Sequence, residues 1–188
     1  MSDGALPDQD ENRSERLEHR WAAVATSIIA LLIVMAVFAG VHQAVLPQSR
    51  VETADPRTLH LGGEFIESNL GSALQPDSSV IVRAIGQQYS FTPQCILVPT
   101  ETPITFRVTS ADVVHGFLIT GTSINLMLVP GYISSIPARF STPGERHMPC
   151  HEFCGFGHEG MWGRIKVIDK AEFARLAADT RRLSCVAQ

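Results

Sequence analysis

Two cysteines, a histidine and a methionine lie within a single stretch of twelve residues, at Cys150, Cys154, His158 and Met161. Thiolate, imidazole and thioether groups are ligands that suit copper or zinc, whereas calcium and magnesium prefer oxygen. Glycines between these residues allow the backbone to turn tightly from one ligand to the next. The stretch therefore predicts a transition-metal site built largely from one loop.

A fifth candidate ligand, His115, lies upstream in the sequence Asp112-Val-Val-His115-Gly116. A lone histidine in a strand is usually a packed or solvated side chain. Here Gly116 permits close approach of another backbone segment, and the loop downstream lacks a ligand from a distant part of the chain. We therefore include His115 in the predicted site.

The number of cysteines separates the candidate metals. A mononuclear blue-copper site uses one cysteine, two histidines and a weak methionine. Cys150 and Cys154 could instead bridge two copper ions, each bound by one histidine, with Met161 and a main-chain carbonyl as weak outer ligands. A closed tetrahedral zinc site with Cys150, Cys154, His158 and either His115 or His151 is the alternative, but it gives Met161 no role.

The segments around these residues have the pattern of β-strands. From Val80 onward, short apolar runs alternate with proline and glycine at intervals of roughly ten residues, as in an antiparallel sandwich or barrel. Ile104, Phe106 and Val108 would share one face of a strand. We expect a mainly β fold with a Greek-key sandwich over 80–169 and an amphipathic helix and tail over 170–188.

The N-terminal part is different in character. Trp21–Val41 contains 21 consecutive residues without a charge, and a bilayer core of ~30 Å needs ~20 apolar residues in a helix. The apolar core of a cleaved signal peptide is usually shorter, ~7–15 residues. We predict an N-terminal segment over 1–20, a membrane helix over 21–46 and a linker over 47–79.

Charge distribution bears on orientation and partners. Arg13, Arg16 and Arg20 precede the apolar run, which favours a cytoplasmic N-terminus and an outer position for the large domain. Residues 47–188 hold thirteen acidic and twelve basic residues. Nucleic-acid binding would require a basic excess, so we expect no nucleic-acid partner.

The ligand pattern resembles that of a known family. Cys-x-Glu-x-Cys-Gly-x-x-His-x-x-Met, preceded by Asp-Val-x-His, is similar to the binuclear copper A domain of cytochrome c oxidase subunit II, which is cupredoxin-like, over about 89–168. The resemblance implies that Cys150 and Cys154 bridge two copper ions. It makes His115 and His158 terminal ligands, Met161 an axial ligand, and Glu152 a ligand through its main-chain carbonyl.

Three features resemble one branch of the family, the short subunit II of B-family haem-copper oxidases. These are the single membrane span, the sequence Val113-Val-His-Gly-Phe117 followed by Gly-Thr-x-Ile-Asn125, and Glu18 three residues before Trp21. The resemblance implies that Glu18 stands at the mouth of a proton-uptake path. It leaves open whether the Glu152 side chain supports a magnesium ion.

The family implies an electron-entry subunit in the cell (inner) membrane, with its copper domain on the periplasmic side. Cytochrome c or a small cupredoxin would supply electrons to the copper pair. These would pass to haem, and to a further copper, in the catalytic haem-copper subunit I, where oxygen is reduced. A copper A subunit of a nitric oxide reductase and a membrane-tethered copper carrier or assembly protein are the alternatives.

Three further residues receive structural interpretations. Cys95 starts an apolar run and is expected to be a buried, inert thiol. Cys185 is expected to be an exposed residue of the tail. Phe153, within the ligand loop, is expected to pack into the core.

Overall fold

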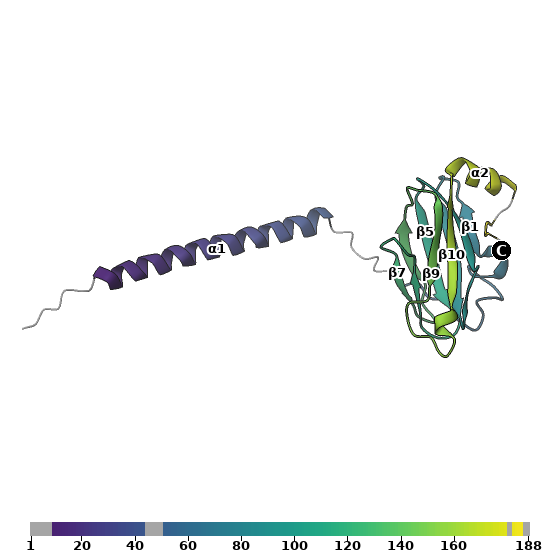
Figure 1. The fold of residues 1–188 in the computed structure, drawn as a ribbon, viewed down its shortest axis with the longest axis horizontal. Helices are drawn as coiled ribbons and strands as arrows, with labels where there is room; N and C mark the ends of the chain where they lie inside the picture. Colours follow the sequence, from purple (N-terminus) through teal and green to yellow (C-terminus); the bar gives the residue numbers. More distant parts are fainter. Residues whose placement is uncertain (1–8, 44–50, 180–181, 186–188) are drawn as a thin grey trace, which may run out of the picture. The chain divides into compact units, whose positions relative to one another are not determined.

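The computed structural model describes residues 9–43, 51–179 and 182–185, and these form two compact units. The first unit contains α1 (Gln9–Gln43), a helix of 35 residues (Figure 1). Within its stretch Asn12–Val41, an 18-residue window reaches a mean hydropathy of 2.7, so the helix is long and apolar enough to cross a membrane. The predicted end of the span, at 46, lies outside the described residues.

The second unit, Arg50–Gln188, is a β-sandwich (Figure 1). Its first sheet has the order β1-β2-β5-β8, with β3 paired to the end of β2. The strands are β1 (Gly71–Leu74), β2 (Val80–Gln87), β3 (Ser90–Thr92), β5 (Ile104–Ser110) and β8 (Ser134–Ala138).

The second sheet has the order β4-β10-β9, and β6 and β7 form a separate two-stranded ribbon. These strands are β4 (Cys95–Pro99), β9 (Gly144–Pro149), β10 (Trp162–Ile168), β6 (His115–Leu118) and β7 (Asn125–Leu128). Two short 3-10 helices complete the unit, η1 (Glu67–Asn69) and η2 (His158–Gly160). The mainly β, cupredoxin-like architecture predicted from the sequence is confirmed.

The strand pattern had led us to expect purely antiparallel pairing, but the sheets also contain parallel pairs. β2 runs parallel to β5, and β4 runs parallel to β10. Both pairs join strands that are not adjacent in the sequence, so each requires a crossover connection. Alternation within a strand reports which face is buried, but it does not report which strand lies beside it.

Side chains from both sheets form one main core. Ile104, Phe106 and Val108 of β5 are buried on the same face, as the alternation predicted. Phe117 of β6 packs edge-on against Phe91, and its ring lies 5.9 Å from that of Phe106. The core therefore connects the strand that begins with His115 to the body of the sandwich.

The described part of the predicted linker is packed onto the sandwich. Within 47–79, β1 forms an antiparallel pair with β2. Leu59, Phe65 and Leu70 are buried together with Ile85 in a second, smaller core. The short apolar elements of this segment therefore bury against the first sheet.

The C-terminal part corrects our interpretation of two cysteines. Helix α2 (Lys170–Asp179) packs against β1 and β4, and the chain then returns as a tail (Figure 1). Leu183 exchanges two main-chain hydrogen bonds of 2.8 Å with Ser72 of β1. Cys95 and Cys185 form a disulfide, so Cys95 is buried but is not a free thiol, and Cys185 is bonded and half-buried rather than exposed. The tail brings the two together because it fills the space between β1 and β4.

Candidate metal centre

The loop Cys150–Met161 connects β9 to β10, and these strands hold its two ends together. Pro149 and Trp162 are directly paired across the antiparallel ladder. The Cys150 N–H donates to the Met161 carbonyl at 3.0 Å, so the loop is closed at its base. Its first and last candidate ligands are therefore fixed by the sheet itself.

The two thiols lie side by side, and each has an imidazole nitrogen beside it. The sulfur atoms of Cys150 and Cys154 are 3.8 Å apart. Nδ1 of His115 lies 3.8 Å from the Cys150 sulfur, and Nδ1 of His158 lies 3.6 Å from the Cys154 sulfur. The ligand atoms of His115, Cys150 and Cys154 all lie within 4.8 Å of one another.

The two weaker candidates complete the cluster. The Met161 thioether sulfur is 3.7 Å from the Cys154 sulfur, and the Glu152 carbonyl oxygen is 3.2 Å from the Cys150 sulfur. The structure thus brings six sequence-predicted residues to one place: His115, Cys150, Glu152, Cys154, His158 and Met161. The seventh, Glu18, belongs to α1 in the other compact unit.

His115 reaches the loop because β6 lies directly against it. The Gly116 carbonyl accepts a hydrogen bond from the His151 N–H at 3.2 Å. A Cβ at Gly116 would stand 2.6 Å from the Glu152 nitrogen, so a side chain here would push β6 away from the loop. The close approach that the sequence indicated is therefore a requirement of the site.

Asp112 orients the His115 ring. Its Oδ1 accepts from Nε2 of His115 at 2.7 Å, which leaves Nδ1 facing the Cys150 sulfur. Partial burial by itself raises the pKa of Asp112, but hydrogen bonds from the Gln88 main chain, His115 and the Val113 main chain lower it overall. Asp112 is thus a carboxylate that fixes the ring orientation of the candidate ligand His115, as carboxylates commonly do for histidines that bind metals.

The Cys154 thiol keeps its proton near neutral pH when no metal is bound. Burial, and after it the neighbouring Cys150, raises the pKa of Cys154 to about 11. Cys154 is only 4% exposed, and His115 is fully buried. A metal ion that binds here must displace the Cys154 proton, because thiolates rather than thiols are the ligands.

The donor set fits copper. Two thiols, two imidazoles, a thioether and one carbonyl converge, and soft sulfur with imidazole favours copper or zinc over hard cations. Each imidazole accompanies a different thiol, an arrangement that suits two ions bridged by both sulfurs. A single tetrahedral zinc would leave the Met161 sulfur, fully buried against Cys154, unexplained.

The surroundings of the cluster differ from the sequence interpretation in two ways. Phe153 is 80% exposed and does not pack into the core, because its ring lies against that of His158, at 5.8 Å between centroids, within the loop itself. Gln88 and Asp112 received no role from the sequence, yet both contact the ligand-bearing segments. For Asp112 a signal existed, since it stands three residues before His115 in the Asp-Val-x-His motif.

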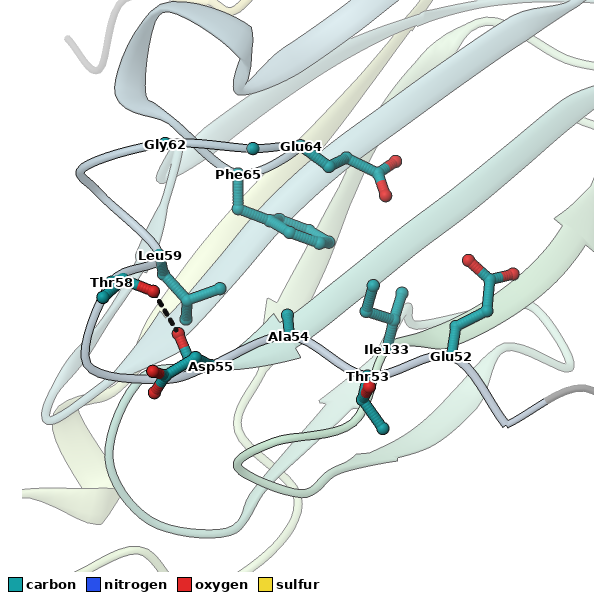
Figure 2. Close-up of a pocket in the computed structure, with 11 residues that line it drawn as sticks. Glu52, Thr53, Ala54, Asp55, Thr58, Leu59, Gly62, Glu64, Phe65 and Ile133 are labelled. Atoms are coloured by element: carbon teal, nitrogen blue, oxygen red, sulfur yellow. Dashed lines mark hydrogen bonds between the residues drawn. The ribbon is translucent and has the colours of Figure 1, made fainter.

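A cavity of about 360 Å³ lies elsewhere on this unit, beneath the segment 52–65 (Figure 2). Figure 2 shows the carboxylates of Glu52 and Glu64 on one side of it. Arg107 donates to both, at 3.1 Å to Glu52 and 2.7 Å to Glu64. Arg83 of β2 also donates to Glu64, at 2.9 Å, so two cations face the two acids, and these ion pairs tie β2 and β5 to the segment before β1.

Comparison with known proteins agrees with the geometry. Residues 71–168 match the family model of the cytochrome c oxidase subunit II periplasmic domain. A cytochrome c oxidase subunit 2 from Thermus thermophilus is 30% identical over 164 residues, covering 84% of this chain and 98% of that one. A second Thermus thermophilus sequence of the same name is 33% identical over 65% of this chain and 91% of its own length.

Among solved structures, a chain of a heme-copper terminal oxidase dimer aligns with a TM-score of 0.57 and 25% identity. The alignment covers 81% of this chain and 99% of that chain. The apolar helix and the periplasmic-domain match together fit a single-pass membrane protein. The chain belongs to the cytochrome c oxidase subunit II family, whose members are subunits of an oxidoreductase complex.

Proposed function

We propose that this chain is the electron-entry subunit of a terminal haem-copper oxidase and holds a binuclear copper A centre. The observation that carries the proposal is the paired arrangement of sulfur and nitrogen, with two thiols 3.8 Å apart and a separate imidazole beside each. A bound copper pair would supply one-electron redox chemistry. The protein residues supply the ligands, their orientation and a water-poor surrounding.

The fold limits how far the ligands can move. Cys150 and Met161 are held at paired strand ends, and His115 begins a strand whose next residues are buried in the core. Asp112 fixes the remaining freedom of the His115 ring. Ligands restrained in this way change position little when the charge of the centre changes, which keeps electron transfer fast.

The electron donor would dock on the exposed side of the loop. Phe153 is 80% exposed and Phe156 is 96% exposed, while the ring of Trp162 is half-exposed at the loop base. Exposed aromatic groups of this kind are enriched in protein interfaces. With the near-neutral charge of residues 47–188, they favour an apolar contact with cytochrome c or a small cupredoxin.

The acceptor would be haem in subunit I, the catalytic partner that carries the further copper. We place the N-terminus in the cytoplasm, because three arginines precede the apolar run. The domain with the copper centre would then face the periplasm. The disulfide Cys95–Cys185 is consistent with that oxidising compartment.

Glu18 is proposed as a proton-entry residue of the assembled complex. It lies one turn before Trp21 on α1, so both side chains fall on one helix face. Tryptophan prefers the membrane interface and would hold the carboxylate there. In Glu18→Ala, copper reduction by the donor should stay fast while steady-state turnover falls several-fold. Unchanged turnover would assign Glu18 to the solvated surface.

The test of the copper proposal is the metal content of the full chain purified from membranes. We expect two copper ions per chain and an oxidised electron-spin spectrum with one unpaired electron shared by both ions. One copper per chain, or zinc alone, would contradict the proposal. Oxygen and nitric oxide uptake by the co-purified complex would identify the terminal acceptor.

A further inference from the structure

Gln88 lies in the turn between β2 and β3 and contacts both segments that carry the candidate ligands. Its side-chain Nε2 donates to the Cys154 carbonyl at 2.6 Å. Its main-chain N–H donates to Oδ2 of Asp112 at 2.7 Å. Cys154 belongs to the β9–β10 loop and Asp112 to the segment before β6, so one residue bridges two parts of the chain that are 42 positions apart.

On the loop side, Gln88 supports the turn that leads from Cys154 to His158. Gly155 adopts φ +130°, and a Cβ there would stand 2.8 Å from both Nε2 of Gln88 and the Tyr89 hydroxyl. The loop backbone therefore rests directly on Gln88 and Tyr89. The Gly155 carbonyl in turn accepts the His158 N–H at 3.1 Å. Holding the Cys154–Gly155 peptide consequently holds the start of η2, which bears His158.

On the other side, Gln88 acts through Asp112. Oδ2 of Asp112 accepts from Gln88, and Oδ1 accepts from Nε2 of His115 at 2.7 Å. The carboxylate is thereby fixed at both oxygens, and the orientation of the His115 ring depends on both bonds. The main-chain bond does not depend on the Gln88 side chain, so the two contacts can be separated by substitution.

We propose that Gln88 is a positioning residue that joins the two halves of the candidate copper centre, one containing His115 and Asp112 and the other Cys154 and His158. The proposal rests on the proposed copper function. Without the Gln88 side-chain bond, the Cys154 carbonyl loses its amide donor. The bond from His151 to Gly116 still joins the loop to β6, but the Cys154–His158 part of the loop is then held less firmly relative to His115. Residues that orient metal ligands typically affect metal affinity by about 10–100-fold when they are removed.

The experiment uses the full-length protein with Gln88→Met and Gln88→Glu. Methionine matches the length of glutamine and keeps the main-chain N–H but has no amide donor. Glutamate places a carboxylate against the Cys154 carbonyl and should have the larger effect. Gln87→Met is the matched control, because Gln87 is the last residue of β2 and pairs with Ser90.

We expect both Gln88 variants to bind copper in the wild-type ratio but to lose it to a chelator about 10–100-fold faster. In the copper-free protein, amide hydrogen exchange should rise at 155–158 and stay unchanged in β5, a difference that general destabilisation would not produce. If the Gln88 variants lose copper to the chelator at the same rate as Gln87→Met, and show the same amide hydrogen exchange, Gln88 does not have the proposed positioning role. A wild-type chain that binds no copper would overturn the proposed function, and with it this proposal.

Discussion

The sandwich holds two pairs of cysteines in opposite covalent states. Cys95 and Cys185, 90 positions apart, form a disulfide where the C-terminal tail meets β4. Cys150 and Cys154 are free thiols although their sulfurs are only 3.8 Å apart. The free pair is surrounded by two imidazoles and a thioether, whereas the bonded pair joins main-chain segments. Neighbouring groups, rather than proximity of the sulfurs, distinguish a metal site from a structural cross-link.

The largest effect, loss of the copper spectrum, should follow from substitution of either free cysteine, Cys150 or Cys154. In Cys150→Ser or Cys154→Ser, a hydroxyl cannot replace a bridging thiolate, so the shared-electron spectrum should disappear completely. Copper per chain and the electron-spin spectrum measure the change. The double variant Cys95→Ser/Cys185→Ser is the control and should keep both. An intact spectrum in either loop variant would show that the thiols do not bridge.

Removal of the Cys95–Cys185 disulfide should change the stability of the fold and leave the copper centre intact. We expect the double variant Cys95→Ser/Cys185→Ser to lower the free energy of unfolding by about 2–5 kcal/mol, because the disulfide closes a long loop, with its two cysteines 90 positions apart. Denaturant midpoints of the copper-free protein, with and without a thiol reductant, measure the loss. The reductant should lower the midpoint of the wild type and leave that of the variant unchanged. If the copper-loaded double variant lost its copper spectrum, the tail would also be needed to hold the metal loop.

A smaller, pH-dependent effect on the free energy of unfolding should follow from substitution of Glu64, which lies near neither pair of cysteines. Burial raises the pKa of Glu64, but Arg107 and then Arg83 outweigh it, so the pKa lies below its ordinary value of 4.5. The charged form is favoured in the folded state. Its stabilisation is therefore complete above pH 4.5 and is lost as the pH falls through the folded pKa.

Glu64→Gln should accordingly lower the free energy of unfolding by roughly 1–2 kcal/mol near neutral pH, since the carboxylate is partly exposed. The difference from the wild type should shrink as the pH falls below 4.5. Thermal unfolding from about pH 3 to about pH 7 measures it, with Glu101→Gln as a control at a largely exposed ion pair. A constant difference across that range would contradict the assignment.

The smallest effect should come from Met161. Its sulfur lies beside Cys154 but is expected to be a weak axial ligand, so Met161→Leu should keep two copper ions per chain. Loss of the thioether removes electron donation to the oxidised centre and should raise the reduction potential, on the order of tens of millivolts. Spectroelectrochemistry would detect the shift. Loss of one copper instead would make Met161 a principal ligand.

The sequence alone was sufficient for the features that depend on local order. Five of the proposed ligands fall in one loop, and the Asp-Val-x-His motif pointed to His115 as the sixth, so ligand types and spacing could be interpreted without a fold. The uncharged stretch 21–41 predicted the long apolar helix. Alternation in β5 predicted its buried face, because side chains alternate regardless of the neighbouring strand.

Only the tertiary structure decided which distant segments meet. The parallel pairs β2/β5 and β4/β10, the disulfide Cys95–Cys185 and the bridge from Gln88 to Cys154 and Asp112 all join positions far apart in the chain. The exposure of Phe153 likewise depends on how the closed loop is placed on the sandwich. The physical reason is that local periodicity specifies the buried face of a segment, whereas its partners are chosen by the packing of the whole core.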